Sequence, residues 1–223
     1  MKILVIAAHP DDEVYGMGGT MAKLSSQGNE IYTLIVTEGC STQYRGNKEI
    51  IEKKKEEAIE ANKILGVKEV MFGDLPDMKL DTLPHVSINR IIEEIIDKVK
   101  PDVVYTHHKG DVNKDHRMVY ESTLVATRPT YLQCVKKLLC YQVPSSTEWN
   151  APVVDEIFIP NAFEDIEMYY SLKEQAILTY KTEIREYPHP RSLKYVEILD
   201  KMTGLKVGLE KAEAFQIIRE IRK

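Results

Sequence analysis

One histidine and three carboxylates stand together near the start of the chain, in the segment His9-Pro10-Asp11-Asp12-Glu13. Zinc in hydrolases usually takes three protein ligands from His, Asp and Glu, and keeps one position for water. His9 and Asp12 are suited to supply two of those ligands from a single loop. Asp11 would then project beside the water position, where a carboxylate can accept a proton, and Glu13 is expected to give structural support. The spacing predicts a hydrolytic metal site that needs one more ligand from elsewhere.

A second polar cluster, from Thr106 to Arg117, can provide that ligand. Its His116 is predicted in the first turn of a helix, with the ring free to point back over the sheet. A simpler interpretation makes Asp11, Asp12 and Asp115 helix N-caps that accept hydrogen bonds from free backbone amides. Four of the six histidines lie in the two clusters, and each cluster directly follows an apolar run. This pairing favours a metal site.

Apolar runs must position the two clusters. Residues 3–6, Ile-Leu-Val-Ile, are apolar on both faces of a strand, which is typical of the centre of a parallel sheet covered by helices. In such sheets ligands bind beyond the carboxyl ends of the strands, and both clusters are expected there. Pro10 biases His9 toward extended geometry, so the first loop begins as a stiff segment.

Strand-like and helix-like segments alternate along the rest of the chain. We expect strands at 31–36, 67–72, 102–106, 137–141 and 156–159, and helices at 16–28, 48–65, 88–99 and 115–126, followed by a helical C-terminal third. This alternation predicts right-handed crossovers. The expected fold is α/β: a Rossmann-like, doubly wound, mainly parallel sheet flanked by helices, in a single domain of residues 1–223. The glycines at 16, 18 and 19 lack the spacing of a phosphate loop, and favour close packing of a helix on a strand.

Composition argues against several classes of partner. The formal net charge is −5 and lysines alternate with glutamates, so no nucleic-acid partner is expected. The three cysteines, an odd number without a C-x-x-C pair, indicate neither a disulfide framework nor a thiolate zinc site. No apolar run is long enough to cross a bilayer. We therefore expect a cytoplasmic protein without membrane insertion.

The segment Ala8-His9-Pro10-Asp11-Asp12-Glu13 resembles the signature of the LmbE-like, or PIG-L, deacetylases. These are zinc-dependent enzymes that remove acetyl from N-acetylglucosamine-type substrates. Further likenesses carry the resemblance over most of the chain: Arg45-Gly46, Leu75-Pro76-Asp77, Asp115-His116 and Glu213-Ala214-Phe215.

The resemblance assigns roles to individual residues. It implies that zinc is held by His9, Asp12 and His116, and that Asp11 is the general base. It also implies that Arg45 contacts the substrate sugar, or a carboxylate or phosphate on it. A site with two histidines, one aspartate and a water also accepts other divalent metal ions.

One position departs from the family pattern. The second motif commonly reads His-x-Asp-His, whereas this chain has Asn113 in place of the first histidine. An asparagine can donate a hydrogen bond to an oxyanion but cannot shuttle a proton. Candidate proton donors are His107 and His108 in the same loop, and His189 in the cluster His189-Pro190-Arg191-Ser192. We favour His189, contributed either in the same chain or by a neighbouring subunit, and expect His108 and Arg191 to bind substrate.

The predicted activity is hydrolytic removal of acetyl from an N-acetylated amino sugar or its conjugate, a small-molecule substrate, by a protein that forms a homo-oligomer. Two alternatives stay open at this stage: a non-catalytic module that binds a sugar or nucleotide, and a hydrolase of another amide or ester. Trp149 is suited to stack on a pyranose face, although a single tryptophan more often belongs to the core.

Overall fold

A seven-stranded sheet runs through the centre of the computed structural model, which describes residues 1–40, 47–130 and 133–222. The strand order is β3-β2-β1-β4-β5-β7-β6. Neighbouring strands are parallel from β3 to β5, and β7 runs antiparallel to both of its neighbours. The strands are β1 (Lys2–Ala7), β2 (Glu30–Thr37), β3 (Glu69–Leu75), β4 (Val103–His107), β5 (Lys137–Tyr141), β6 (Ala162–Asp165) and β7 (Ala212–Glu220).

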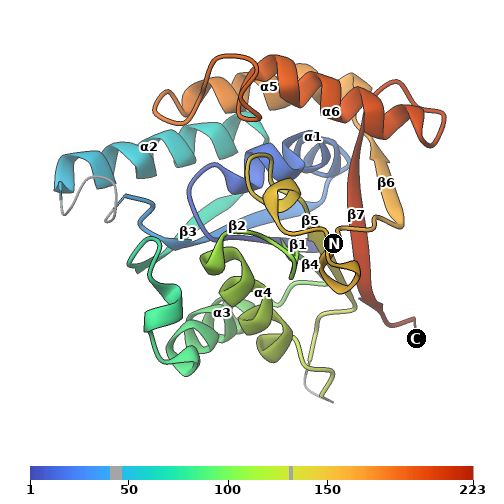
Figure 1. Cartoon of the computed structure of the whole chain (residues 1–223). Helices are drawn as coiled ribbons and strands as arrows, with labels where there is room; N and C mark the ends of the chain where they lie inside the picture. Colours follow the sequence, from blue (N-terminus) through green and yellow to red (C-terminus); the bar gives the residue numbers. More distant parts are fainter. Residues whose placement is uncertain (41–46, 131–132, 223) are drawn as a thin grey trace.

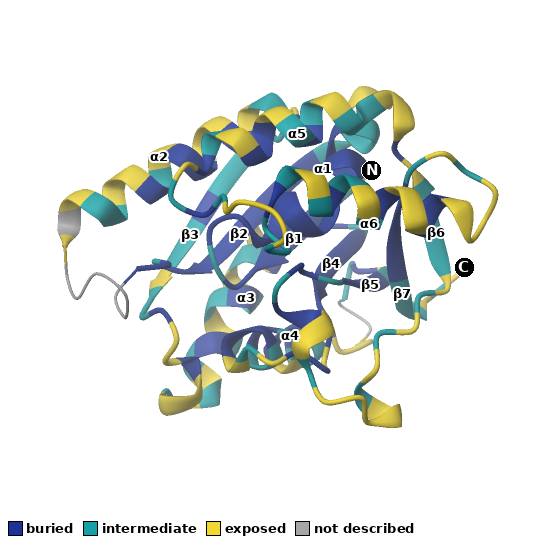
Figure 2. Ribbon diagram, turned by 45° about the horizontal axis from the view of Figure 1, so that its top comes forward, coloured by how far each residue is buried: buried dark blue, intermediate teal, exposed yellow. Residues whose placement is uncertain are grey.

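Helices cover both faces of this sheet (Figures 1 and 2). One face carries α1 (Asp12–Ser26), α2 (Lys48–Ile64), α5 (Tyr170–Thr179) and α6 (Leu193–Leu205), and the other carries α3 (His85–Val99) and α4 (Lys114–Ala126). Short 3₁₀ turns lie at η1 (Leu80–Thr82), η2 (Thr147–Trp149), η3 (Val154–Glu156) and η4 (Glu167–Tyr169). The Rossmann-like α/β fold expected from the sequence is confirmed, in a single domain.

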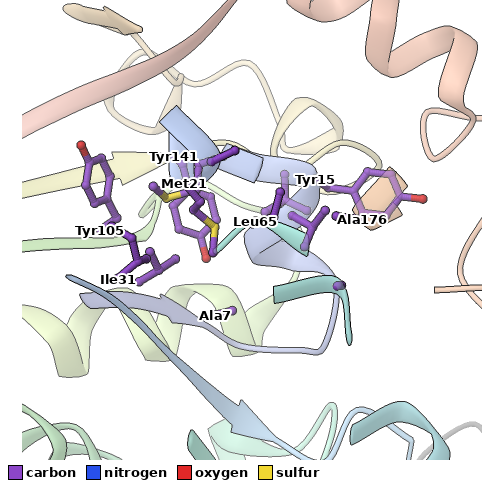
Figure 3. Close-up of a cluster of buried hydrophobic side chains, with 14 of the residues drawn as sticks. Ala7, Tyr15, Met21, Ile31, Leu65, Tyr105, Tyr141 and Ala176 are labelled. Atoms are coloured by element: carbon purple, nitrogen blue, oxygen red, sulfur yellow. The ribbon is translucent and has the colours of Figure 1, made fainter. Parts of the chain in front are cut away.

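The central strand β1 is buried on both faces, as its continuous apolar run predicts. Ile3, Val5 and Ala7 pack into the core beneath α1, α2, α5 and α6. Leu4 and Ile6 pack into the core beneath α3 and α4. Figure 3 shows part of the first core, where Tyr141 and Met21 lie close to the sheet. Burial on both faces fixes the position at which β1 ends, and therefore where the loop that follows it begins.

Helix α1 is interrupted at Met17, whose φ of −155° is not helical. The backbone amides of Gly19 and Thr20 would lose their helical partners there, and they donate instead to the Glu213 carboxylate of β7, at 3.0 and 2.7 Å. A Cβ at Gly16 would overlap the Tyr141 ring. These glycines serve close packing, as the sequence indicated, and the acidic residue of the Glu213-Ala214-Phe215 segment supports the helix that carries the first motif.

Two predicted elements were wrong. Residues 156–159 form no strand, because Ile157 and Ile159 are exposed and lie between η3 and β6. The C-terminal third is not wholly helical, since it ends in β7. The charged sequence of β7 suits a helix, but its alternating apolar residues pair with β5 and β6, and tertiary packing overrides local propensity. Among the described residues, no helix is long and apolar enough to cross a membrane.

Candidate metal and active site

The first motif forms the turn between β1 and α1. Helix α1 begins at Asp12, and Asp11 precedes it with a φ of 109°, a conformation that is uncommon outside glycine. Asp12 accepts a hydrogen bond from the backbone N–H of His9 at 2.9 Å, which closes the turn on itself. Gly39 packs against Pro10 so closely that a Cβ would overlap the proline ring. Such strain is typical of functional sites, where surrounding packing holds the backbone in place.

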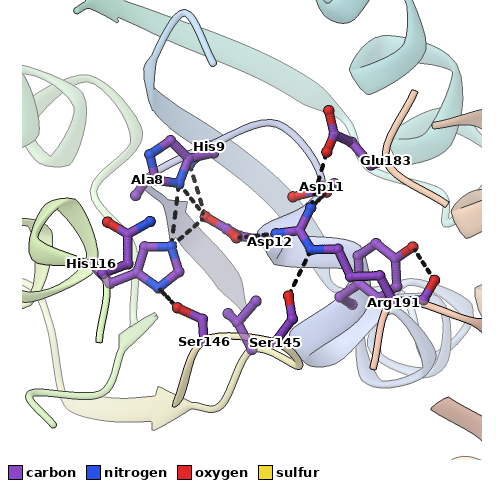
Figure 4. Close-up of polar contacts among 12 residues, drawn as sticks. Ala8, His9, Asp11, Asp12, His116, Ser145, Ser146, Glu183 and Arg191 are labelled. Carbon is purple, nitrogen blue, oxygen red and sulfur yellow. Dashed lines mark hydrogen bonds and ion pairs between the residues drawn. The ribbon is translucent and has the colours of Figure 1, made fainter. Parts of the chain in front are cut away.

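Three ligand atoms meet at this turn, as Figure 4 shows for His9, Asp12 and His116. His9 Nδ1 lies 3.2 Å from His116 Nε2 and 3.3 Å from Asp12 Oδ2, and His116 Nε2 lies 3.2 Å from Asp12 Oδ2. A tetrahedral zinc ion with bonds of roughly 2.0–2.2 Å separates its ligand atoms by roughly 3.3–3.6 Å. The triangle therefore fits a zinc-sized divalent ion, and it joins the two motifs that the sequence separates by about a hundred residues.

Carboxylates stand behind both histidines. His9 Nε2 lies 3.1 Å from Asp115 Oδ2 and 3.3 Å from Asp77 Oδ1, and His116 Nδ1 lies 3.0 Å from Asp111 Oδ2. Histidines that bind metals usually donate the outer ring N–H to such a group, which leaves the inner nitrogen free for the metal. The roles of these three aspartates were missed from the sequence, although Asp77 and Asp115 lie in segments that carry the family resemblance.

The site strongly favours positive charge. Burial lowers the pKa of a histidine, but at His9 the carboxylates of Asp115 and Asp12 outweigh burial and raise the pKa to about 10. At His116, Asp12 and Asp111 likewise overcome burial and raise the pKa to about 9. Burial raises the pKa of Asp12, but the neighbouring histidines dominate and hold it well below its usual range. The carboxylates that stabilise the protonated histidines would also stabilise a divalent cation in the triangle.

Asp11 is buried beside the triangle and faces a basic residue from the far end of the chain. Its Oδ2 accepts a hydrogen bond from Arg191, and its Oδ1 has no hydrogen-bond partner among the described residues. Arg191 also lies 3.3 Å from Glu183 and donates to Ser145 Oγ at 3.0 Å (Figure 4). Burial raises the pKa of Asp11 well above its usual range, and Arg191 opposes that rise. A carboxylate with a raised pKa and a free oxygen is suited to accept a proton near neutral pH.

A cavity of about 220 Å³ opens over these residues. His9 and Asp11 line its floor. Asn113, His189 and Arg191, which the sequence predicted for the site, line its walls. The cavity is also lined by Ser145 and by three charged residues whose involvement the sequence did not indicate: Lys54, Glu183 and Arg185.

The predicted proton-handling and oxyanion residues are brought to the cavity with defined contacts. Asn113 caps α4 by accepting from the backbone N–H of Asp115 at 2.9 Å, and its Nδ2 donates one hydrogen to Met78 Sδ at 3.4 Å, which leaves the second amide hydrogen as a donor among the described residues. His189 Nδ1 accepts the backbone N–H of Arg191 at 3.0 Å, so the neutral ring carries its proton on Nε2.

Three other predictions have different outcomes. His108 is buried, contacts Phe158 edge-on, and is not among the residues that line the cavity. The described structure does not bring it to the site. His107 is also buried, and its Nε2 accepts the backbone N–H of Ala8 at 2.8 Å, which supports the first motif from below. Arg45 lies outside the described residues.

Comparisons with known proteins agree with this geometry. Residues 4–127, more than half of the chain, match the PIG-L family, described as GlcNAc-PI de-N-acetylase. The uncharacterized deacetylase YaiS of Escherichia coli (strain K12) is 32% identical over 189 residues, which cover 81% of this chain and 90% of that protein. The chain belongs to the PIG-L family.

Two further proteins are similar to this chain, one in sequence and one in fold. The diacetylchitobiose deacetylase of Thermococcus kodakarensis is 28% identical over 198 residues, which cover 83% of this chain and 71% of that protein. The solved structure of N,N′-diacetylchitobiose deacetylase from Pyrococcus horikoshii, in complex with an inhibitor, has a TM-score of 0.79 over 98% of this chain and 84% of that one. Its identity is 22%, so this likeness concerns the fold. The PIG-L chain described here thus has relatives that are named deacetylases.

Proposed function

We propose that this protein is a metal-dependent N-deacetylase that hydrolyses the acetamide of an N-acetylated amino sugar or its conjugate. The observation that carries the proposal is the position of Asp11. Asp11 lines the same cavity as His9, one member of a triangle of ligand atoms that fits zinc, and its Oδ1 is buried without a hydrogen-bond partner among the described residues. A metal triangle beside a free carboxylate is the arrangement that amide hydrolysis requires.

The metal in this proposal is held by His9, Asp12 and His116. When bound, a zinc ion supplies a Lewis acid that polarises the amide carbonyl and makes water more acidic. Another divalent ion with similar geometry would supply the same chemistry.

The residues around the metal divide the remaining work. Asp11 accepts the proton of the attacking water at Oδ1, while Arg191 holds the other carboxylate oxygen and fixes the direction of the group. The Asn113 amide donates to the oxyanion that develops on the carbonyl oxygen. The proton taken from water then passes from Asp11 to the leaving amine, with His189 relaying it at Nε2, so that the amine gains a proton as the C–N bond breaks and Asp11 returns to its carboxylate form. In this scheme Arg191 orients the base, whereas the sequence suggested that it binds substrate.

The remaining parts of the proposal concern the context of the reaction. The whole chain, residues 1–223, acts as one deacetylase domain on a small-molecule amino sugar. The cytoplasm suits three free cysteines, two of them buried. Self-association of the chain stays a prediction.

Replacement of Asp11 tests the proposal directly. Asp11→Asn keeps the shape of the side chain but removes its basicity, so acetate release should fall by about 10²–10⁴-fold. Zinc content, measured by elemental analysis, should stay at that of the wild type, because the ligand triangle is intact. Wild-type protein should release acetate from N-acetylglucosamine conjugates with zinc and stop when a chelator is added. Normal turnover by the Asn variant would show that the base is wrongly assigned.

A further inference from the structure

The cavity is too small to enclose more than one sugar-sized group. Its volume is about 220 Å³, whereas pockets that enclose drug-sized ligands are roughly 300–1,000 Å³. Any second ring attached to the acetylated sugar must therefore lie outside the cavity, across its rim. The side chains at the rim therefore decide which conjugates bind well.

Two exposed apolar side chains, Trp149 and Val112, adjoin residues that line the cavity. Trp149 is 55% exposed and Val112 is 52% exposed. Both backbone amides donate to the same carbonyl oxygen, that of Ser146, at 3.3 and 3.4 Å, so the two side chains start from adjoining positions. The expectation that a single tryptophan belongs to the core is wrong here. A large aromatic side chain left in water is an informative exception to ordinary burial.

Each member of this pair lies next to a residue that lines the cavity. Val112 directly precedes Asn113, a wall residue. The Trp149 ring lies 6.0 Å from the His189 ring, centroid to centroid, with the planes at 77°. His189 is the wall residue proposed to serve the leaving amine. The apolar pair is thus continuous with the wall at which the acetylated sugar would be held.

The turn that presents Trp149 is firmly anchored. In η2, the Thr147 backbone N–H donates to the Val143 carbonyl at 3.0 Å, and Thr147 Oγ1 donates to Asp111 Oδ2 at 2.9 Å. Asp111 is the carboxylate behind His116, and Figure 4 shows Ser146 of the same segment beside the His116 ring. The backbone that carries Trp149 is therefore tied to the residues around the metal triangle, so the indole starts from a defined position beside the cavity.

We propose that Trp149 and Val112 form a second subsite, which binds a pyranose ring linked to the acetylated sugar. This inference rests on the proposed function and adds a substrate class to it: N-acetylated disaccharides or longer conjugates in preference to the free monosaccharide. One face of a pyranose presents mainly C–H groups, which pack on an indole plane while the hydroxyls stay in water. His189 and Asn113 line the cavity and adjoin this pair, so the two rings would lie side by side across the rim.

Tryptophan fluorescence offers a direct test, because Trp149 is the only tryptophan of the chain. The zinc-loaded Asp11→Asn variant, which should not turn over, is titrated with N,N′-diacetylchitobiose and separately with N-acetylglucosamine. The disaccharide should change the emission intensity or maximum in a saturable way, and the monosaccharide should change it much less. Equal responses to both sugars, or none to the disaccharide, would overturn the subsite.

Kinetics of substituted proteins supply the second measurement. Trp149→Ala should lower kcat/KM for the disaccharide by about tenfold, mainly through KM, and that for the monosaccharide by less than about twofold. Trp149→Phe should restore most of the loss, since it keeps an aromatic face. Met168→Ala, which trims an exposed apolar residue that does not line the cavity, is the control and should match the wild type. Equal losses on both substrates would contradict the proposal.

The two measurements separate failure of the subsite from failure of the proposed function. A fluorescence response to the disaccharide without acetate release by the wild type would support the subsite and reject the deacetylase. Acetate release that is indifferent to Trp149 would support the deacetylase and reject the subsite.

Discussion

Two groups of buried charges lie in this molecule, and they differ in how far their hydrogen bonds are satisfied. The metal-site cluster holds His9, Asp11, Asp12 and His116 under a cavity. The second group, here called the Lys173 cluster, consists of Lys173 on α5, Asp200 on α6 and Glu213 on β7. Lys173 Nζ lies 2.7 Å from Asp200 and 2.8 Å from Glu213, and all three side chains are buried.

The Lys173 cluster is closed. Both oxygens of Glu213 accept backbone amides of α1 in addition to the ion pair, and none of the three residues has a buried polar atom without a partner. In the metal-site cluster, by contrast, Asp11 Oδ1 and Asp12 Oδ1 are both buried without a hydrogen bond among the described residues. Buried charge alone thus does not mark a functional site. Unused lone pairs next to a cavity do, because an unpaired buried polar atom is costly unless a ligand or reaction uses it.

Among the tests of this contrast, removal of a proposed metal ligand should have the largest effect, which falls on zinc content and acetate release. His116→Ala opens the ligand triangle and leaves Asp111 without its histidine partner, so zinc content should fall to near zero. Acetate release should drop by at least about a thousandfold, since the Lewis acid is lost. Elemental analysis and an acetate assay provide the two measurements. His85→Ala serves as the matched control, because His85 does not line the cavity. Stoichiometric zinc in the His116 variant would remove this residue from the ligand set.

The Lys173 cluster should respond in stability instead. Lys173→Met leaves two buried carboxylates without their shared cation, and loss of one partner from a buried ion pair costs about 3–5 kcal/mol of unfolding free energy. Denaturant unfolding measures this loss. Protein that remains folded should keep its zinc and most of its specific activity, because no member of the cluster lines the cavity. If Lys173→Met left the stability unchanged but abolished the activity, the Lys173 cluster would be functional as well, and the contrast between the two clusters would be wrong.

The smallest expected effect is a pH dependence in the same cluster. Burial raises the pKa of Asp200 to about 7, with Lys173 opposing and Glu213 reinforcing the rise. The folded state therefore binds the Asp200 proton more tightly than the unfolded chain, where the pKa is about 3.9. The stability from this group is complete below pH about 4 and declines as the pH rises to about 7.

Asp200→Asn removes that titration. Between pH 5 and pH 8, the wild type should lose roughly 2 kcal/mol of unfolding free energy relative to the variant. Urea unfolding at the two pH values provides the comparison. Parallel pH profiles for the two proteins would mean that the buried carboxyl does not titrate in this window.

The sequence was most informative where local pattern and tertiary role coincide. The apolar run of β1 and the acidic turn after it are contiguous, so the strand, the loop and two candidate metal ligands could be predicted together. His116 was found because it follows β4, the strand next to β1, at the same edge of the sheet. These inferences needed only periodicity and the geometry of parallel sheets.

The missed features depend on contacts between distant segments. Glu183 is one of 35 acidic residues, and nothing nearby indicates that it pairs with Lys54 and approaches Arg191. The β7 strand has a sequence suited to a surface helix until β5 and β6 supply its partners. Local patterns carry no information about such partners, because the partners are chosen by the fold.

Because α1 is interrupted at Met17, the site beside it is completed only when residues that are synthesised much later have packed against it. The first motif is synthesised well before Glu213, the carboxylate that completes its helix, which comes about two hundred residues later in the chain. Arg191, which orients Asp11, is also late. Contacts with such long sequence separation form only after a large loop has closed. The site is therefore expected to become rigid late in folding, and a nascent chain should carry the first motif well before it can hold Asp11 in the position that we propose for the base.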